Sequence, residues 1–233
     1  LRSLMLIGNF KIQSGDSLET FSSLRMLHIE STKFDVLVES LYQLKHLRYL
    51  ALIKCNDLDR LPENIHKMKF LQHISLEDCE SVVKLPNSIV RLHELRHLDL
   101  DGTRVNSIPR GFGALTNLRT LYGFTAHVDG DWCSLEELGP LFNLRSIGLV
   151  NLQNVSDASF ATKVKLGEKV SLSQLILNCT GRLGINEFTK DSVSEKDQGM
   201  VEEVFDGLYP PPCIEDIRIY NYFGRQLPKW MMS

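Results

Sequence analysis

One pattern of leucines recurs along the first half of the chain. The stretch LRYLALIKC, which begins at Leu47, has leucines at its first, fourth and sixth positions and a cysteine at its ninth. Similar stretches begin at Leu1, Leu24, Leu71 and Leu95, so that successive copies start 23 or 24 residues apart. Self-similarity at such a period is typical of repeat proteins, in which each copy packs mainly against its neighbours. This periodicity constrains the fold more strongly than the length of 233 residues does.

Each copy contains a strand pattern followed by a looser return. In residues 49–53, leucines alternate with other side chains, which predicts a short strand with one buried face. From Leu58 to Met68 the large apolar residues recur at spacings of three and four, which indicates short helical or coiled segments. Pro62 has no backbone N–H to donate, so a regular strand is discouraged on this return path.

Stacking such copies predicts the fold class. We expect an α/β repeat, a leucine-rich-repeat right-handed solenoid (a horseshoe) with a parallel β-sheet on its concave face. Residues 1–233 should form a single repeat domain, with regular repeats over 1–117 and irregular repeats over 118–233. Later strand segments are expected from Leu144, Leu172 and Ile214. Because the sequence does not begin with Met and its first residue already holds the first repeat position, we expect a fragment of a longer protein.

The second half contains three departures from the regular pattern. The stretch YGFTAHVDGDW from Tyr122 is expected to be a loop, and SLEELGPLF to contain one helical turn on the convex side. Residues at about 180–199 are polar and aperiodic, which predicts an exposed insertion. Apolar residues between Met200 and Leu208 then follow at helical spacing and predict a short amphipathic helix that the next prolines end.

Composition excludes several classes of function. The net charge is −3, and no run of Lys and Arg is present, so nucleic-acid binding is not expected. No segment is long and apolar enough to suggest a membrane span. Cys55 and Cys79 occupy the ninth position of neighbouring copies and are expected to be buried, reduced turn residues, which favours an intracellular protein. The sequons at Asn154 and Asn178 point towards a secreted protein instead.

The sequence also resembles a known class of proteins. The segments LEELGPLFNLRSI, NLQNVSDASFA, KLGEKVSLSQLIL and YPPPCIEDIRIYNYFGRQLPKW, together with LPENI and LPNSI, resemble the repeat domain of plant intracellular immune receptors. The class is that of the coiled-coil nucleotide-binding leucine-rich-repeat (NLR) disease resistance proteins of grasses. The resemblance covers nearly the whole chain, although LPxxI alone is shared with animal intracellular scaffolds.

The resemblance implies a sensor that is not an enzyme. In that family the repeat domain recognises a pathogen effector, directly or through a guarded host protein, and holds the receptor's own nucleotide-binding domain inactive. ADP or ATP would then be bound only by the missing nucleotide-binding domain, and this chain has no GxxxxGK[ST] loop to cradle phosphates. The resemblance implies a cytoplasmic location, with nuclear or membrane-associated forms of the full receptor also open. The alternative is an intracellular repeat scaffold for signalling or ubiquitin-ligase assembly.

We expect the binding surface on the concave wall, where every second strand side chain points outward. The predicted protein-binding residues are Met26, His28, Glu30, Tyr49, Ala51, Ile53, His73, Ser75, Glu77, Asp78, His97, Asp99, Asp101, Tyr122, Ile176, Arg218 and Tyr220. No catalytic, cofactor-binding or metal-binding residues are predicted.

Three groups of side chains on or beside this wall have two interpretations each. His73 and His97 should be neighbours and either face solvent or begin a metal site that lacks a third ligand. Glu77, Asp78, Asp99 and Asp101 form either a solvated face or a docking surface for a basic patch. A column of arginines at position two is expected to pair with Glu94, Asp101 or strand-edge carbonyls, and nucleic-acid binding is the less favoured reading. The column comprises Arg2, Arg25, Arg48, Arg96, Arg119 and Arg145.

Overall fold

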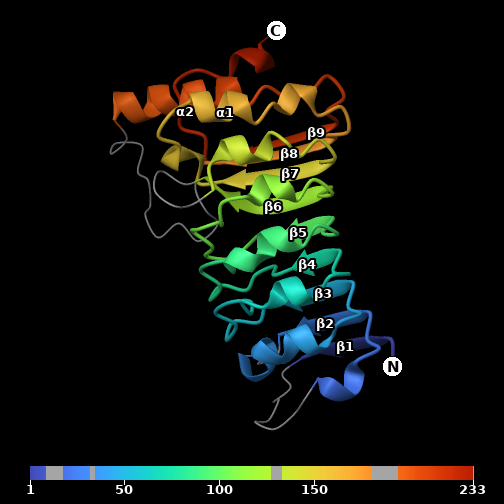
Figure 1. Ribbon diagram of the computed structural model, residues 1–233. Coiled ribbons are helices and arrows are strands. Elements are labelled where there is room, and N and C mark those ends of the chain that lie inside the picture. Colours follow the sequence, from blue (N-terminus) through green and yellow to red (C-terminus); the bar gives the residue numbers. More distant parts are fainter. Residues whose placement is uncertain (9–17, 32–34, 127–132, 180–193, 233) are drawn as a thin grey trace.

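Nine parallel strands form one sheet whose order follows the sequence (Figure 1). The computed structural model describes residues 1–8, 18–31, 35–126, 133–179 and 194–232. The strands are β1 (Ser3–Ile7), β2 (Met26–Glu30), β3 (Tyr49–Ile53), β4 (His73–Ser75), β5 (His97–Asp99), β6 (Thr120–Thr125), β7 (Ser146–Val150), β8 (Gln174–Asn178) and β9 (Asp216–Tyr220).

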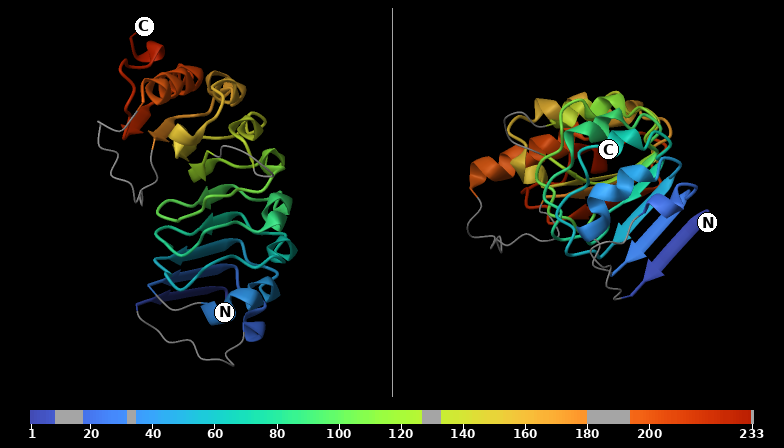
Figure 2. Two further views of the ribbon diagram at one scale, coloured as in Figure 1. Left: turned by 90° about the vertical axis from the view of Figure 1, so that its left-hand side faces the viewer. Right: turned by 60° about the horizontal axis from the view of Figure 1, so that its bottom comes forward.

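The segments between strands return on the opposite side as short helices. The left view in Figure 2 shows the stack curving towards its strands, so that the sheet lines the concave face and the helices lie on the convex face. The predicted leucine-rich-repeat solenoid with a concave parallel sheet is confirmed. The helices are α1 (Ser159–Lys163), α2 (Glu195–Gly207) and 3-10 helices at Glu19–Phe21, Asp35–Gln43, Ile65–Lys67, Asn87–Arg91, Phe112–Ala114, Leu135–Leu138, Leu152–Asn154, Leu166–Glu168 and Lys229–Met231.

The leucine pattern builds one continuous core. Leu27, Leu50, Ile74, Leu98 and Leu121 are register partners on consecutive strands, and each is completely buried. Leu24, Leu47, Leu71 and Leu95 begin later copies and are buried in the same way, whereas Leu1 at the end of the stack is 70% exposed. A buried Leu or Ile contributes about 1.5–3 kcal/mol relative to an exposed one. Since neighbouring copies supply most of that burial, the stack is stable only as an array.

The chain leaves the regular strands through a recurring left-handed turn. Ser31, Lys54, Asp78 and Gly102 hold the eighth position of successive copies and have φ values of 55°, 52°, 57° and 73°. Residues other than glycine rarely adopt this conformation, so its repetition is a property of the fold and not of one side chain. In the sequence, this turn is indicated by glycine at the eighth position of two copies, Gly8 and Gly102.

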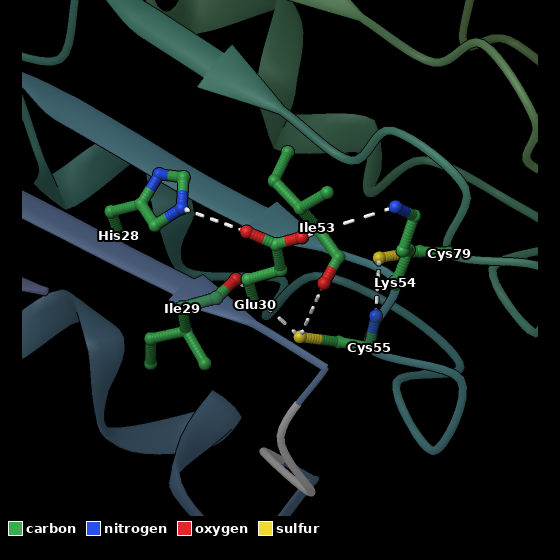
Figure 3. A network of polar contacts seen from close by, with 7 residues as sticks. All are labelled: His28, Ile29, Glu30, Ile53, Lys54, Cys55 and Cys79. Carbon is green, nitrogen blue, oxygen red and sulfur yellow. Dashed lines mark hydrogen bonds and ion pairs between the residues drawn. The ribbon is translucent and has the colours of Figure 1, made fainter. Parts of the chain in front are cut away.

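The ninth-position cysteines fasten one copy to the next, as predicted. Cys55 Sγ donates to the carbonyl of Ile29 at 3.7 Å (Figure 3), and Cys79 Sγ donates to that of Leu52 at 3.1 Å. Neither cysteine is part of a disulfide, and both are fully buried. Hydrogen bonding to Cys55 and burial raise the pKa of Cys79, which keeps it a neutral thiol. At the other ninth positions, Thr103 bonds within its own copy, and residues 9 and 32 lie outside the described residues.

Two predicted segments have different boundaries in the structure. Tyr122 to Thr125 continue β6 instead of forming a loop, and residues 127–132 lie outside the described residues. Of the predicted polar insertion, 180–193 also lie outside them, whereas 194–199 already belong to α2 and its cap. Helix α2 begins early because the Ser194 side chain accepts a hydrogen bond from the Asp197 N–H, which is typical of a helix start.

A glycine bulge explains why the extra residues of β6 remain within the sheet. The register between β6 and β7 shifts between Leu121 and Phe124, and Gly123 has φ of 71°. A Cβ atom at Gly123 would lie 2.6 Å from the carbonyl carbon of Leu100. Glycine is therefore required at this position, since it alone combines this backbone conformation with such a close approach.

A buried lysine stabilises the first irregular repeats. Lys169 is completely buried, and its Nζ donates to the carbonyls of Leu138 at 2.9 Å, Gly139 at 3.0 Å and Leu141 at 3.2 Å. These carbonyls lie at the end of the convex helix Leu135–Leu138, where free acceptors are expected. Burial lowers the pKa of Lys169 to about 8. The ammonium therefore supplies the hydrogen bonds that the helix end lacks.

Candidate protein-binding surface

The outward side chains form three rows that run across the sheet. The first row, at the third repeat position, contains a stack of three rings: Tyr49 and His73 have centroids 4.1 Å apart, and His73 and His97 are 4.0 Å apart. Burial and the neighbouring His97 lower the pKa of His73 to about 4, and burial also lowers that of His97. Both histidines are thus neutral near pH 7, and their predicted proximity is confirmed.

The second row contains the two residues for which the predicted exposure is wrong. Ala51 and Ser75 are paired in register between His28 and Asp99, but they are only 1% and 5% exposed. Their side chains are short, and on a concave surface longer neighbours close over them. They form the floor of the wall and offer a partner little area.

The third row separates into an apolar end and a charged middle. Ile7 is 57% exposed at the β1 end and is followed in register by Glu30 and Ile53. The Glu30 carboxylate lies 3.8 Å from His28 Nε2 and 3.9 Å from Lys54 Nζ, as Figure 3 shows. Glu30 therefore belongs to a mixed cluster and not to the acidic patch.

The predicted acidic patch does assemble in the middle of the wall. Asp99 is partly buried, and its pKa rises to about 6 because of burial and the nearby charges of Glu77, Asp101 and Asp78. The Asp101 N–H opposes this rise by donating to Asp99 Oδ1 at 2.9 Å. The Asp78 N–H also donates to the Asp101 carbonyl at 2.9 Å, so the chain segments that follow β4 and β5 bring these acidic residues together. The middle of the wall consequently favours positively charged ligands.

Beyond β5 a polar chain crosses several strands. The Tyr122 hydroxyl donates to Gln174 Oε1 on β8, and Gln174 Nε2 donates to Asp216 Oδ2 on β9 at 3.0 Å. Arg218 Nε lies 3.0 Å from the same Asp216 oxygen. Tyr122 can pass over β7 because that strand has Gly148 at the crossing point, where a Cβ would lie 3.1 Å from Tyr122 Cδ1.

The other predicted residues lie on the wall with different degrees of exposure. Glu77, Arg218 and Tyr220 are exposed, whereas the following are partly exposed: Met26, His28, Glu30, Tyr49, Ile53, His73, Asp78, His97, Asp99, Asp101, Tyr122 and Ile176. Gln174 and Gly148 were not among the predicted residues, although a glycine inside a strand signals a close approach. Met5 and Ile7 were also missed, although the alternation in LRSLMLIGN places them on the same rows.

The arginine column lies at the N-terminal ends of the strands, and its predicted pairing with carboxylates is not found among the described residues. All six side chains are exposed, and no ion pair joins them to Glu94, Asp101 or another carboxylate within the described ranges. For Asp101 the reason is distance along the chain, because it lies five residues beyond Arg96, or roughly 16 Å at 3.3 Å per residue. Arg25, Arg48, His46 and Phe70 line a hollow of about 70 Å³ there.

Neither a metal cluster nor a membrane span is found in the part of the chain that the structure describes. No group of three or more His, Cys, Asp or Glu side chains is arranged to hold a metal ion among those residues. None of their helices has the length and hydropathy needed to cross a bilayer.

Comparisons with known proteins agree with this geometry. The relatives include Disease resistance RPP13-like protein 4 of Arabidopsis thaliana, which is 27% identical over 137 residues. That match covers 57% of this chain and 14% of the relative, so the chain spans a small part of the relative's length.

Two solved structures share the fold at low sequence identity. One is the ectodomain of the Arabidopsis thaliana receptor kinase GASSHO1/SCHENGEN3, solved in complex with CASPARIAN STRIP INTEGRITY FACTOR 2. It is 14% identical with a TM-score of 0.54, and the match covers 94% of this chain and 24% of the ectodomain chain. The other is a leucine-rich-repeat protein of Leptospira interrogans, which is 17% identical with a TM-score of 0.50. This match covers 92% of the present chain and 65% of the Leptospira chain. The family profile described as "Leucine-rich repeat region" matches residues 1–233. With its register of buried leucines, its concave sheet and this match over the full length, the chain belongs to the leucine-rich-repeat family.

Proposed function

We propose that the chain is the ligand-recognition and autoinhibitory domain of an intracellular plant immune receptor. It would sense a pathogen effector, either directly or through a guarded host protein, and would also contact the receptor's own nucleotide-binding domain. The observation that carries the proposal is a wall of outward side chains in a chain that is similar to a disease resistance protein. In leucine-rich repeats the scaffold supplies a surface, and function depends on the side chains placed there.

The proposed role is recognition without catalysis, in the cytoplasm. Outward residues of a shallow wall bind a partner through anchors such as Tyr49 and Tyr122, because tyrosines often dominate interface energies once they lose water. Nucleotide binding is assigned to the nucleotide-binding domain of the complete receptor, so the isolated chain should not bind ADP or ATP. Equilibrium dialysis of the chain with labelled ATP tests that point.

The recognition surface is tested by changing it while leaving the core intact. A quadruple variant with Tyr49→Ala, Glu77→Gln, Asp99→Asn and Tyr122→Ala in the complete receptor should abolish effector-dependent pull-down and cell death. Far-UV circular dichroism of the corresponding chain should match that of the wild type.

A matched control changes exposed residues of the convex face. The triple variant Glu63→Ala, Lys67→Ala and Arg91→Ala should recognise the effector normally. Unchanged recognition by the quadruple variant would reject the concave wall as the recognition surface.

A further inference from the structure

The middle of the wall places a tyrosine on the strand next to a group of crowded carboxylates, and its ring extends over β7 towards Gln174. Asp99 on β5 and Tyr122 on β6 are register partners, so their side chains leave adjacent strands on the same face. Glu77, Asp78 and Asp101 lie close enough to Asp99 to repel its negative charge. Within the described residues, no ion pair supplies Asp99 with a cation.

The Tyr122 ring is held in place before any partner arrives. Its hydroxyl is anchored to Gln174, which is itself anchored to Asp216. Gly148 beneath the ring has no side chain to displace it, since even a Cβ there would come within 3.1 Å. A ring whose hydroxyl is anchored and which lies over a glycine loses little rotational freedom on binding, which favours its use as an anchor.

We propose that this part of the concave wall is a docking surface for an arginine or lysine side chain of a partner protein, seated against the Tyr122 ring beside the Asp99 carboxylate. The inference rests on the proposed function and adds the chemistry of one contact to it. The argument is charge complementarity: an aromatic face attracts a cation, and a carboxylate beside it accepts hydrogen bonds from the same group. Arginine fits better than lysine because its planar guanidinium both stacks and donates in pairs.

This arrangement assigns Gly148 and Gln174 as positioning residues. Gly148→Val would push the ring off β7, and Gln174→Ala would release its hydroxyl, although neither residue would touch the cation itself. Both changes should weaken cation binding while leaving Asp99 and its neighbouring carboxylates Glu77, Asp78 and Asp101 unchanged. A purely electrostatic attraction to the acidic patch would not respond to either change.

The test uses the 233-residue chain and a fluorescein-labelled pentapeptide that contains two arginines, followed by fluorescence anisotropy at about 50 mM NaCl to limit screening. The same peptide with citrulline in place of arginine keeps the shape without the charge. We expect Tyr122→Leu, Asp99→Asn and Gly148→Val each to weaken binding by about fivefold to tenfold. Tyr122→Phe keeps the ring but, like Gln174→Ala, removes the anchor of its hydroxyl, so both variants should weaken binding by no more than about threefold. Glu63→Gln on the convex face should change binding less than about twofold.

The inference is overturned if the wild type does not prefer the arginine peptide over the citrulline peptide. It is also overturned if Tyr122→Leu or Gly148→Val binds as well as the wild type, or if Glu63→Gln loses as much as Asp99→Asn. Urea unfolding of each variant identifies any that fail to fold, and Tyr122→Phe then decides the role of the ring. If the peptide does not bind, only this inference is overturned, because effector recognition by the complete receptor is measured in a separate assay. Conversely, peptide binding combined with unchanged recognition by the quadruple variant would reject the concave wall as the surface for the effector, while the contact with the arginine peptide would stand.

Discussion

Replacing Lys169 by Met removes the ammonium while keeping an unbranched apolar side chain of similar length. In the native protein Lys169 Nζ donates to three carbonyls at 2.9–3.2 Å. The carbonyl of Leu138 keeps a second donor, the N–H of Leu141 at 3.1 Å. Among the described residues, Gly139 and Leu141 would have unpaired buried carbonyls, each of which costs about 1–3 kcal/mol. The variant also no longer has to bury a charge, which offsets part of this cost. We therefore expect the free energy of unfolding to fall by about 2–4 kcal/mol.

The loss is measured by urea unfolding and hydrogen exchange at pH 7. Lys45→Met, at an exposed lysine in a regular copy, is the control and should stay within about 0.5 kcal/mol of the wild type. Repeat arrays often unfold in parts, so exchange of the amides in residues 135–145 reports the local effect directly. A loss of about 3 kcal/mol corresponds to exchange that is faster by roughly two orders of magnitude in this segment.

The pH dependence of the same variant provides an independent check. The pKa of Lys169 is about 8 in the folded protein against an ordinary value of 10.5, so the folded state holds fewer protons between those pH values. The wild type should therefore gain stability relative to Lys169→Met as the pH rises from 8 to 10.5, by up to about 1.4 kcal/mol per pH unit. If Lys169→Met is as stable as the wild type and the difference curve is flat, the lysine does not stabilise the irregular repeats.

Three further changes test other parts of the structure. Leu98→Ala should lower the free energy of urea unfolding by about 2–5 kcal/mol through a cavity at the centre of the stack, and a loss below about 1 kcal/mol would contradict the register of the core. Asp99→Asn removes a carboxyl whose pKa is about 6 in the folded protein. The stability of the variant minus that of the wild type should therefore rise between pH 4 and 6, by up to about 1.4 kcal/mol per pH unit. A flat difference curve would show that the pKa of Asp99 is not raised in the folded protein. The difference curve is needed because His73, with a pKa of about 4, contributes with the opposite sign. Gly123→Ala should lower the midpoint of thermal unfolding, with Gly199→Ala on α2 as the control, and equal midpoints would contradict the bulge.

The strands were predictable because their signal is repeated. Leu50, Ile74 and Leu98 hold the same place in copies of nearly constant length, and register in a parallel stack follows from that spacing alone. The neighbouring histidines and the acidic patch followed from the same register. Exposure did not, since Ala51 and Ser75 are hidden by the size of their neighbours and the curvature of the wall.

The irregular repeats could not be predicted in this way, because their burial depends on single contacts. Hydropathy alone would predict the wrong burial at Lys169 and Val170: the lysine is completely buried, whereas the valine is 80% exposed. Nothing in the local sequence signals that unpaired carbonyls of an earlier helix lie opposite residue 169. Similarly, the reach of Tyr122 to Gln174 depends on the missing side chain of Gly148, a contact between strands that are not neighbours.

The sequential order of the strands has a consequence for how such a surface can change. Each strand is bonded only to those before and after it in the chain, so excising one whole copy, such as residues 47–70, would bring β2 against β4 with every leucine still matched to a leucine or isoleucine. Duplicating a copy would lengthen the wall by one strand in the same way. Gain and loss of whole units can therefore redraw the pattern of outward side chains while the interior stays chemically uniform.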